Sequence, residues 1–214
     1  MAGSVSNVEV CNLAFSGQLE ELRQAILSDK ALASKADQDG RTALHWACSA
    51  GHTEVVEFLL SLGVEVNLQD DAAWTPLHIA ASAGREDIVR SLIGKRAQLN
   101  SVNQNGCTPL HYAASKDRYE IALLLLENGA DPNATDKLDS TPLHRASAKG
   151  NYRLIQLLLK QSASTNIQDS QGNTALYVCR SIHFLMRYCE CWHRLPAEGR
   201  KRSHGDCYLT SPLW

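Results

Sequence analysis

Residues 75–84 read TPLHIAASAG, and closely related stretches recur along the chain at a fixed interval. Successive copies begin 33 residues apart, at Thr42-Ala-Leu-His45, Thr75-Pro-Leu-His78, Thr108-Pro-Leu-His111, Thr141-Pro-Leu-His144 and Thr174-Ala-Leu-Tyr177. An asparagine keeps the same interval, at Asn67, Asn100, Asn133 and Asn166. A period of this length indicates a solenoid, in which each unit packs only against its neighbours.

Each copy predicts a pair of helices. Thr is a favourable N-cap, and Pro suits the first helical position because its missing N–H would be unpaired there anyway. The first helix is expected to end near Gly51, Gly84 and Gly150, where a left-handed residue closes a helix without a Cβ penalty, and Asp117 takes that place in one unit. The second helices, around 55–60, 88–93, 121–126 and 154–159, have wide apolar stripes that need neighbours on both sides.

Thr-Pro-Leu-His in a 33-residue helix-pair unit resembles the ankyrin repeat. The resemblance implies an all-α fold, an ankyrin-repeat solenoid of stacked helix-turn-helix units with β-turn connections. We expect an ankyrin domain over 1–176, with an amino-terminal capping unit around 12–27, four complete repeats and the start of a sixth unit. Arg96 and Ser162 stand where Gly63 and Gly129 end the second helices of other units, and each is expected to cost up to about 1 kcal/mol because φ is positive there.

Residues 177–214 form a divergent tail with six basic and three acidic side chains, against 15 basic and 20 acidic before it. Apolar residues at i, i+3, i+4, i+7 and i+10 predict an amphipathic helix over 181–194, which would cap the last unit, and disorder over 196–214. Cys189-x-Cys191-x-His193 has ligand types that zinc accepts, but its spacing matches no familiar site. Arg200-Lys-Arg202 is either a nuclear-import signal or, more simply, a solvated charge run.

The 214 residues, 44% hydrophobic and 21% charged with a formal charge of −2, are typical of a soluble globular protein. No apolar run approaches the roughly 20 residues that cross a bilayer. Seven cysteines and an amino terminus without a secretory signal predict reduced thiols and an intracellular location.

Within the ankyrin class, the segments VCNLAFSGQLEELRQAIL, RTALHWACSAGHTEVVEFLL, VNQNGCTPLHYAASK and STNIQD are similar to ankyrin-repeat chaperones of the proteasome regulatory particle. That resemblance implies a cytoplasmic and nuclear protein that clamps the C-terminal domain of a proteasomal ATPase subunit during assembly. It also implies cell-cycle partners, namely a cyclin-dependent kinase and a p53-directed ubiquitin ligase. Retinoblastoma binding is not carried over, because Leu176-Tyr-Val-Cys179-Arg lacks the family's Leu-x-Cys-x-Glu motif. The alternative is a cyclin-dependent kinase-binding ankyrin regulator without a proteasomal role.

Repeat solenoids bind partners on the surface formed by the turns before each first helix and by the exposed side chains of that helix. We expect that the side chains at the turn tips, Asp136 among them, and at the helix ends are not needed for the core. The predicted contacts are Gln38, Asp39, Arg41, Trp46, Ser49, Asp70, Asp71, Trp74, Ser82, Gln104, Asn105, Tyr112, Ser115, Lys116, Lys137, Arg145 and Lys149.

Two properties favour this surface. The early turns are acidic and the later units basic, which suits a partner of opposite gradient, and aromatic rings are common at binding hot spots. Trp46 could instead belong mostly to the core, and Trp74 could merely cover a turn. We expect Arg41 and Lys116 to meet acidic helices of the ATPase domain, so that Arg41→Glu with Lys116→Glu abolishes binding without changing the melting curve.

The sequence does not predict an enzyme, a metal site or a cofactor. His45, His78, His111 and His144 stand at equivalent places in successive units, so we expect a structural row in which each His bonds back to its capping Thr. No phosphate-binding glycine loop, nucleophile elbow or His-Glu-x-x-His helix is present. Cys48 and Cys107 are expected to be small packing residues.

Overall fold

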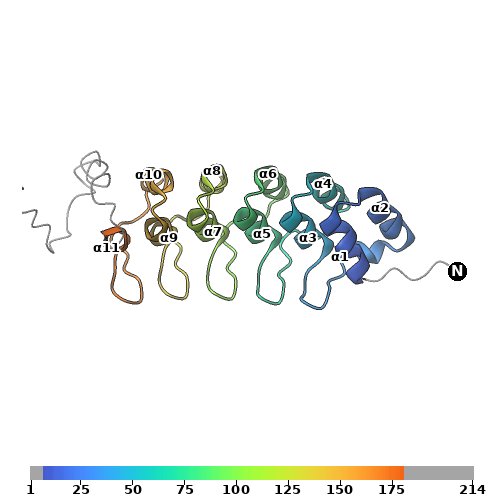
Figure 1. The fold of residues 1–214 in the computed structure, drawn as a ribbon, viewed down its shortest axis with the longest axis horizontal. Coiled ribbons are helices and arrows are strands. Elements are labelled where there is room, and N and C mark those ends of the chain that lie inside the picture. The colour runs from blue at the N-terminus through green and yellow to red at the C-terminus, as the bar shows by residue number, and fades with distance from the viewer. Residues whose placement is uncertain (1–6, 181–214) are drawn as a thin grey trace, which may run out of the picture.

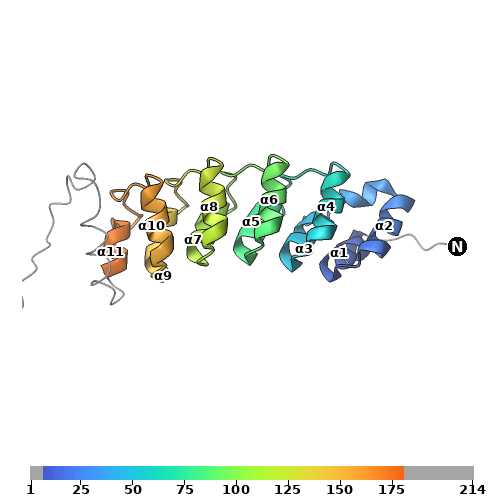
Figure 2. The ribbon, with the colours of Figure 1, turned by 90° about the horizontal axis from the view of Figure 1, so that it is seen from above.

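The structure, a computed structural model, describes residues 7–180. Within this span, helix pairs stack along one axis, and a long turn hangs below each first helix from the second unit onward (Figure 1). Figure 2 shows the same units from above, following one another in order along the chain. The predicted ankyrin solenoid is confirmed.

The first helices form one row, in which each packs against the first helix of the next unit. They are α1 (Asn7–Ser16), α3 (Ala43–Ala50), α5 (Pro76–Ala83), α7 (Pro109–Ser115), α9 (Pro142–Lys149) and α11 (Ala175–Arg180).

The second helices form the other row and also contact one another in order. They are α2 (Leu19–Ser28), α4 (Thr53–Ser61), α6 (Glu86–Gly94), α8 (Tyr119–Glu127) and α10 (Tyr152–Lys160), and a 3-10 turn, η1 (Lys30–Ala33), follows α2. We number the units 1 to 6 by their first helices, so that unit 1 holds α1 and α2, and unit 6 holds α11.

The helix boundaries follow the local signals of the sequence. Thr75 and Thr141 cap α5 and α9, and Pro occupies the first position of both helices. Gly51, Gly84 and Gly150 adopt left-handed conformations at helix ends, and Asp117 does so after α7 with φ 56°. Arg96 and Ser162 both have φ 62°, so their predicted positive φ is confirmed.

The core runs through all units without interruption. Small side chains let neighbouring first helices approach closely, and these are the fully buried Ala47, Ala80, Ala113 and Ala146. The second helices contribute larger residues, such as Val55, Val56 and Leu59 of α4. Because each unit buries its apolar surface against the next, the stack presents its turns in a regular series.

The described part of the chain has no β-strand, only two isolated bridges that pair Ala36 with Thr42 and Gln168 with Thr174. None of the helices in residues 7–180 is long and apolar enough to span a membrane. The first helix of unit 6 crosses the predicted domain boundary at 176 and ends at Arg180. The predicted amphipathic helix at 181–194, the disorder at 196–214, the Cys/His group and the basic run lie outside the described residues.

Candidate protein-binding surface

The turns and the side chains of the first helices beside them form one face of the solenoid, which we call the turn face. Its turns span residues 37–41, 70–74, 103–107, 136–140 and 169–173. The backbones of adjacent turns are joined: the N–H groups of Asp71, Gln104, Lys137 and Ser170 donate to the carbonyl oxygens of Asp39, Ala72, Asn105 and Leu138 at 2.9–3.0 Å. The turn face is therefore a connected surface, not a set of independent loops.

An Asp or Asn organises each turn from within. In the third unit, Oδ1 of Asp70 accepts the N–H groups of Ala72 and Trp74 at 3.0 and 2.8 Å. The same two bonds, to the residues two and four positions later, are made by Asp37, Asn103, Asp136 and Asp169. A carboxylate or amide oxygen that accepts two backbone donors fixes the turn's conformation.

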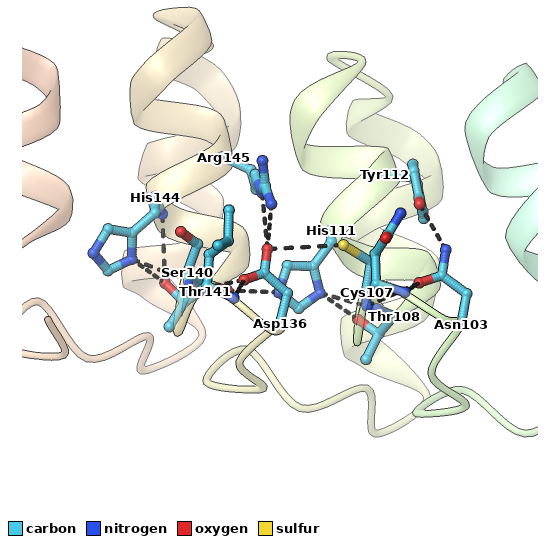
Figure 3. Close-up of polar contacts among 12 residues, drawn as sticks. Asn103, Cys107, Thr108, His111, Tyr112, Asp136, Ser140, Thr141, His144 and Arg145 are labelled. Carbon is cyan, nitrogen blue, oxygen red and sulfur yellow. Dashed lines mark hydrogen bonds and ion pairs between the residues drawn. The ribbon is translucent and has the colours of Figure 1, made fainter. Parts of the chain in front are cut away.

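The other side-chain atom of this Asp or Asn usually meets the residue nine positions later, on the first helix. The indole N–H of Trp46 donates to Asp37 at 2.8 Å, and Nε of Arg145 donates to Asp136 at 3.1 Å (Figure 3). At the neutral Asn103 the amide is the donor, and the hydroxyl oxygen of Tyr112 accepts at 2.7 Å. In these units the helix residue donates a hydrogen bond where the turn residue is a carboxylate, and accepts one where the turn residue is an amide.

Units 3 and 6 are exceptions, with Ile79 and Val178 nine positions after Asp70 and Asp169, and unit 3 explains the role of Arg41. Ile79 occupies the equivalent place on α5 and has no polar group, so Asp70 receives its bond from another unit. Nε of Arg41, in the preceding turn, donates to Oδ2 of Asp70 at 2.9 Å, and its guanidinium lies 5.2 Å from the centre of the Trp46 ring. Arg41 therefore links two turns.

Four charged side chains expected on the open surface, namely Arg41, Asp70, Asp136 and Arg145, are consequently paired within the fold. The expectation that Asp70 is a free turn-tip residue is wrong: it is buried, at 6% exposure, because its carboxylate accepts from its own turn and from Arg41. The expectation that Arg41 and Arg145 are free cations is also wrong, because each is paired with a buried carboxylate. Arg145 donates two hydrogen bonds to Asp136. Burial opposes the charge of Asp136, but hydrogen bonds from Arg145 and from backbone N–H groups outweigh it and lower the pKa of Asp136 below 3.8.

The remaining predicted contacts are at least partly accessible on the turn face. Two of the aromatic rings pack against each other: the centres of the Trp74 and Tyr112 rings lie 4.4 Å apart. Trp46 and Trp74 are half-buried, so each both packs and offers surface. The exposed residues are Gln38, Asp39, Asp71, Gln104, Asn105, Lys116, Lys137 and Lys149, and the half-buried ones, besides the three rings and the two paired arginines, are Ser49, Ser82 and Ser115.

The histidine row lies beneath this surface, as predicted. In each complete unit Nδ1 accepts the N–H of the capping Thr at 3.1–3.2 Å. Nε2 donates to a carbonyl oxygen of the next unit, from His45 to Trp74, His78 to Cys107, His111 to Ser140 and His144 to Asn173, at 2.9–3.2 Å. This pattern requires neutral rings with the proton on Nε2. Burial accordingly lowers the pKa of His45, His78 and His111, that of His78 to about 4.

Family models for ankyrin repeats match this chain in three overlapping stretches: a single repeat at residues 39–71, three copies at 62–136 and many copies at 130–178. These stretches run without a gap from 39 to 178. They cover the four complete units of the structure.

Curated relatives from Homo sapiens, Mus musculus and Rattus norvegicus carry the name 26S proteasome non-ATPase regulatory subunit 10 (gankyrin). The protein from Homo sapiens is 72% identical over 74 residues, 35% of this chain and 33% of that protein, and the one from Mus musculus is 69% identical over the same length. The matched stretch therefore spans about a third of the length of these relatives. The mitochondrial liver isoform of glutaminase from Mus musculus is 48% identical over 61 residues, only 10% of that protein. The helix pairs, the 33-residue period and the three family matches agree, and the chain belongs to the ankyrin-repeat family.

Proposed function

We propose that this chain is a non-catalytic scaffold of the proteasome regulatory particle, acting as an assembly chaperone that holds the C-terminal domain of an ATPase subunit against the turn face. The observation that carries the proposal is the connected turn face, in which an Asp or Asn side chain fixes each turn and leaves the tips free for a partner. The 72% identity over 74 residues to a proteasome regulatory subunit supports a partner within the proteasome.

A scaffold role suits the chemistry of the buried groups. The histidines of the row use both ring nitrogens in structural bonds, so they have no nitrogen left for acid–base work. Burial raises the pKa of the Cys11 thiol to about 12 and raises those of Cys48 and Cys107. These thiols therefore stay protonated at neutral pH and are poor nucleophiles.

The unpaired charges of the turn face indicate the orientation in which the partner would bind. Asp39 and Asp71 are exposed in the second and third units, whereas Lys116, Lys137 and Lys149 are exposed in the fourth and fifth. Arg41 pairs with Asp70, so these two charges cancel and the exposed Asp39 and Asp71 give the acidic end its net charge. We propose that acidic helices of the ATPase domain meet the lysine end of the face.

The test is the affinity of the full chain for the isolated C-terminal domain of a proteasomal ATPase, measured by calorimetry. Lys116→Glu is expected to weaken binding about tenfold through charge reversal, because Lys116 forms no ion pair within residues 7–180. Lys160→Glu, on α10 in the other row of helices, is the matched control and should leave affinity unchanged. Arg41→Glu is a poor probe, since it would set a second carboxylate against Asp70 and destabilise the fold.

Absence of binding to any proteasomal ATPase domain would refute the proposal. Co-purification of a cyclin-dependent kinase without proteasomal ATPases would favour a kinase-binding regulator instead. The same variants apply to either partner, because both would use the turn face.

A further inference from the structure

A hollow of about 440 Å³ opens on the turn face between the turns of units 4 and 5. Its walls combine cationic, aromatic and apolar groups. Lys137 and Leu138 line it from one turn, Asn105 and Cys107 from the other, and Tyr112 and Arg145 from the helices.

Arg145 is held rigidly at one wall of this hollow. Its Nε and Nη2 atoms donate to the buried carboxylate of Asp136, and Cys107 Sγ lies 3.8 Å from the same oxygen (Figure 3). The side chain of Asp136 is 1% exposed, whereas that of Arg145 is 37% exposed. The third guanidinium nitrogen, Nη1, makes no hydrogen bond to residues 7–180 and is available to a ligand.

The charges of the hollow add up to a single positive charge. Arg145 is neutralised by Asp136, His111 is neutral because burial lowers its pKa, and Lys137 makes no ion pair within the described residues. One unpaired ammonium beside a free guanidinium N–H suits a monovalent carboxylate better than a doubly charged phosphate.

The remaining walls indicate what accompanies that carboxylate. Leu138 is 57% exposed, and the half-buried Tyr112 ring packs against Trp74, so an aliphatic stem or neighbouring apolar side chain would find cover there. A glutamate followed or preceded by an aliphatic residue fits both requirements.

We propose that this hollow is an anchoring subsite that takes one glutamate side chain of the partner, with its carboxylate between Lys137 Nζ and Arg145 Nη1 and its stem against Leu138 and Tyr112. The proposal rests on the proposed function, because it assigns to the ATPase domain the glutamate that fills the hollow. Asp136 acts through Arg145 and is a positioning residue.

The experiment compares three full-length variants with the unmodified chain for binding to the isolated ATPase domain. Lys137→Glu reverses the free charge, Leu138→Ser removes the apolar wall without changing charge, and Lys95→Glu is the charge control at the end of α6. Within residues 7–180, neither Lys137 nor Leu138 forms a hydrogen bond or ion pair through its side chain, and their turn contacts come from backbone atoms. Unchanged melting curves check that all three variants fold.

Lys137→Glu is expected to weaken binding about tenfold at low salt, and a severalfold loss should persist at about 0.5 M salt, where long-range attraction is screened. Leu138→Ser should weaken binding about threefold, and Lys95→Glu should have no effect. If the unmodified chain binds and Lys137→Glu binds equally well, or if the loss of affinity in Lys137→Glu vanishes at high salt, only the subsite proposal is overturned. Failure of the unmodified chain to bind would overturn both this proposal and the proposed function.

Discussion

Mild acid should destabilise this solenoid through its buried histidines, and His78 gives the sharpest case. The His78 side chain is fully buried, and burial, only partly offset by hydrogen bonds to carbonyl groups, lowers its pKa from 6.5 to about 4. Because the folded-state pKa is the lower one, the unfolded chain binds the proton first as the pH falls. The stability contributed by neutral His78 is therefore complete above pH 6.5 and is lost between about 6.5 and 4.

The size of the effect follows from the two pKa values. Between pH 7 and pH 5, a group titrating at 6.5 when unfolded and about 4 when folded lowers the free energy of unfolding by about 2 kcal/mol. His45 and His111, whose pKa values are also lowered by burial, add losses of the same sign. Asp37, Asp136 and Asp169 have pKa values below 3.8, so their contribution is lost mainly below pH 5, outside this window.

The assay is urea unfolding followed by circular dichroism, at matched ionic strength, across pH 5 to 7. His78→Gln is the matched variant: it should be less stable at every pH, but its loss between pH 7 and pH 5 should be smaller by about 2 kcal/mol. The claim that the buried histidines are neutral would be refuted if the free energy of unfolding did not change over this pH range. It would also be refuted if that free energy changed with pH equally in His78→Gln and in the unmodified chain.

Three further changes test other parts of the fold by the same unfolding assay. Ser147→Ala should stabilise the chain by about 1 kcal/mol, since the Ser147 hydroxyl is fully buried without a hydrogen bond and Ala stands at the equivalent place in units 3 and 4; a destabilised variant would reveal a missed partner. Arg96→Gly should stabilise by about 0.5 kcal/mol because φ is 62° at this position, and a loss would mean that the Arg96 side chain supports the fold. Asp136→Ala should destabilise by about 3 kcal/mol by freeing two turn N–H groups and leaving Arg145 unpaired, so a near-neutral result would contradict the structural role of this turn residue.

Much of the binding surface could be located from sequence, but the state of its charges could not. The 33-residue period places the turns on one face, and the exposed Lys116, Lys137 and Lys149 lie there as expected. The burial of Asp70 could not be predicted from sequence, because its partners are the backbone of its own turn and an Arg 29 residues earlier. The sequence does contain a periodic signal for the turn residues, which recur in steps of 33 from Asp37 to Asp169.

Each helix pair can be predicted from local sequence, because capping threonines, prolines, left-handed glycines and apolar stripes act within a few residues of the chain. Which charges remain free depends on the stacking of the units. Ile79 cannot bond to Asp70, so Arg41 crosses between turns, whereas Arg145 stays with Asp136 of its own unit. A buried carboxylate without a hydrogen-bond donor is costly in free energy. Its partner is therefore whichever donor the stacking of units brings within hydrogen-bond distance.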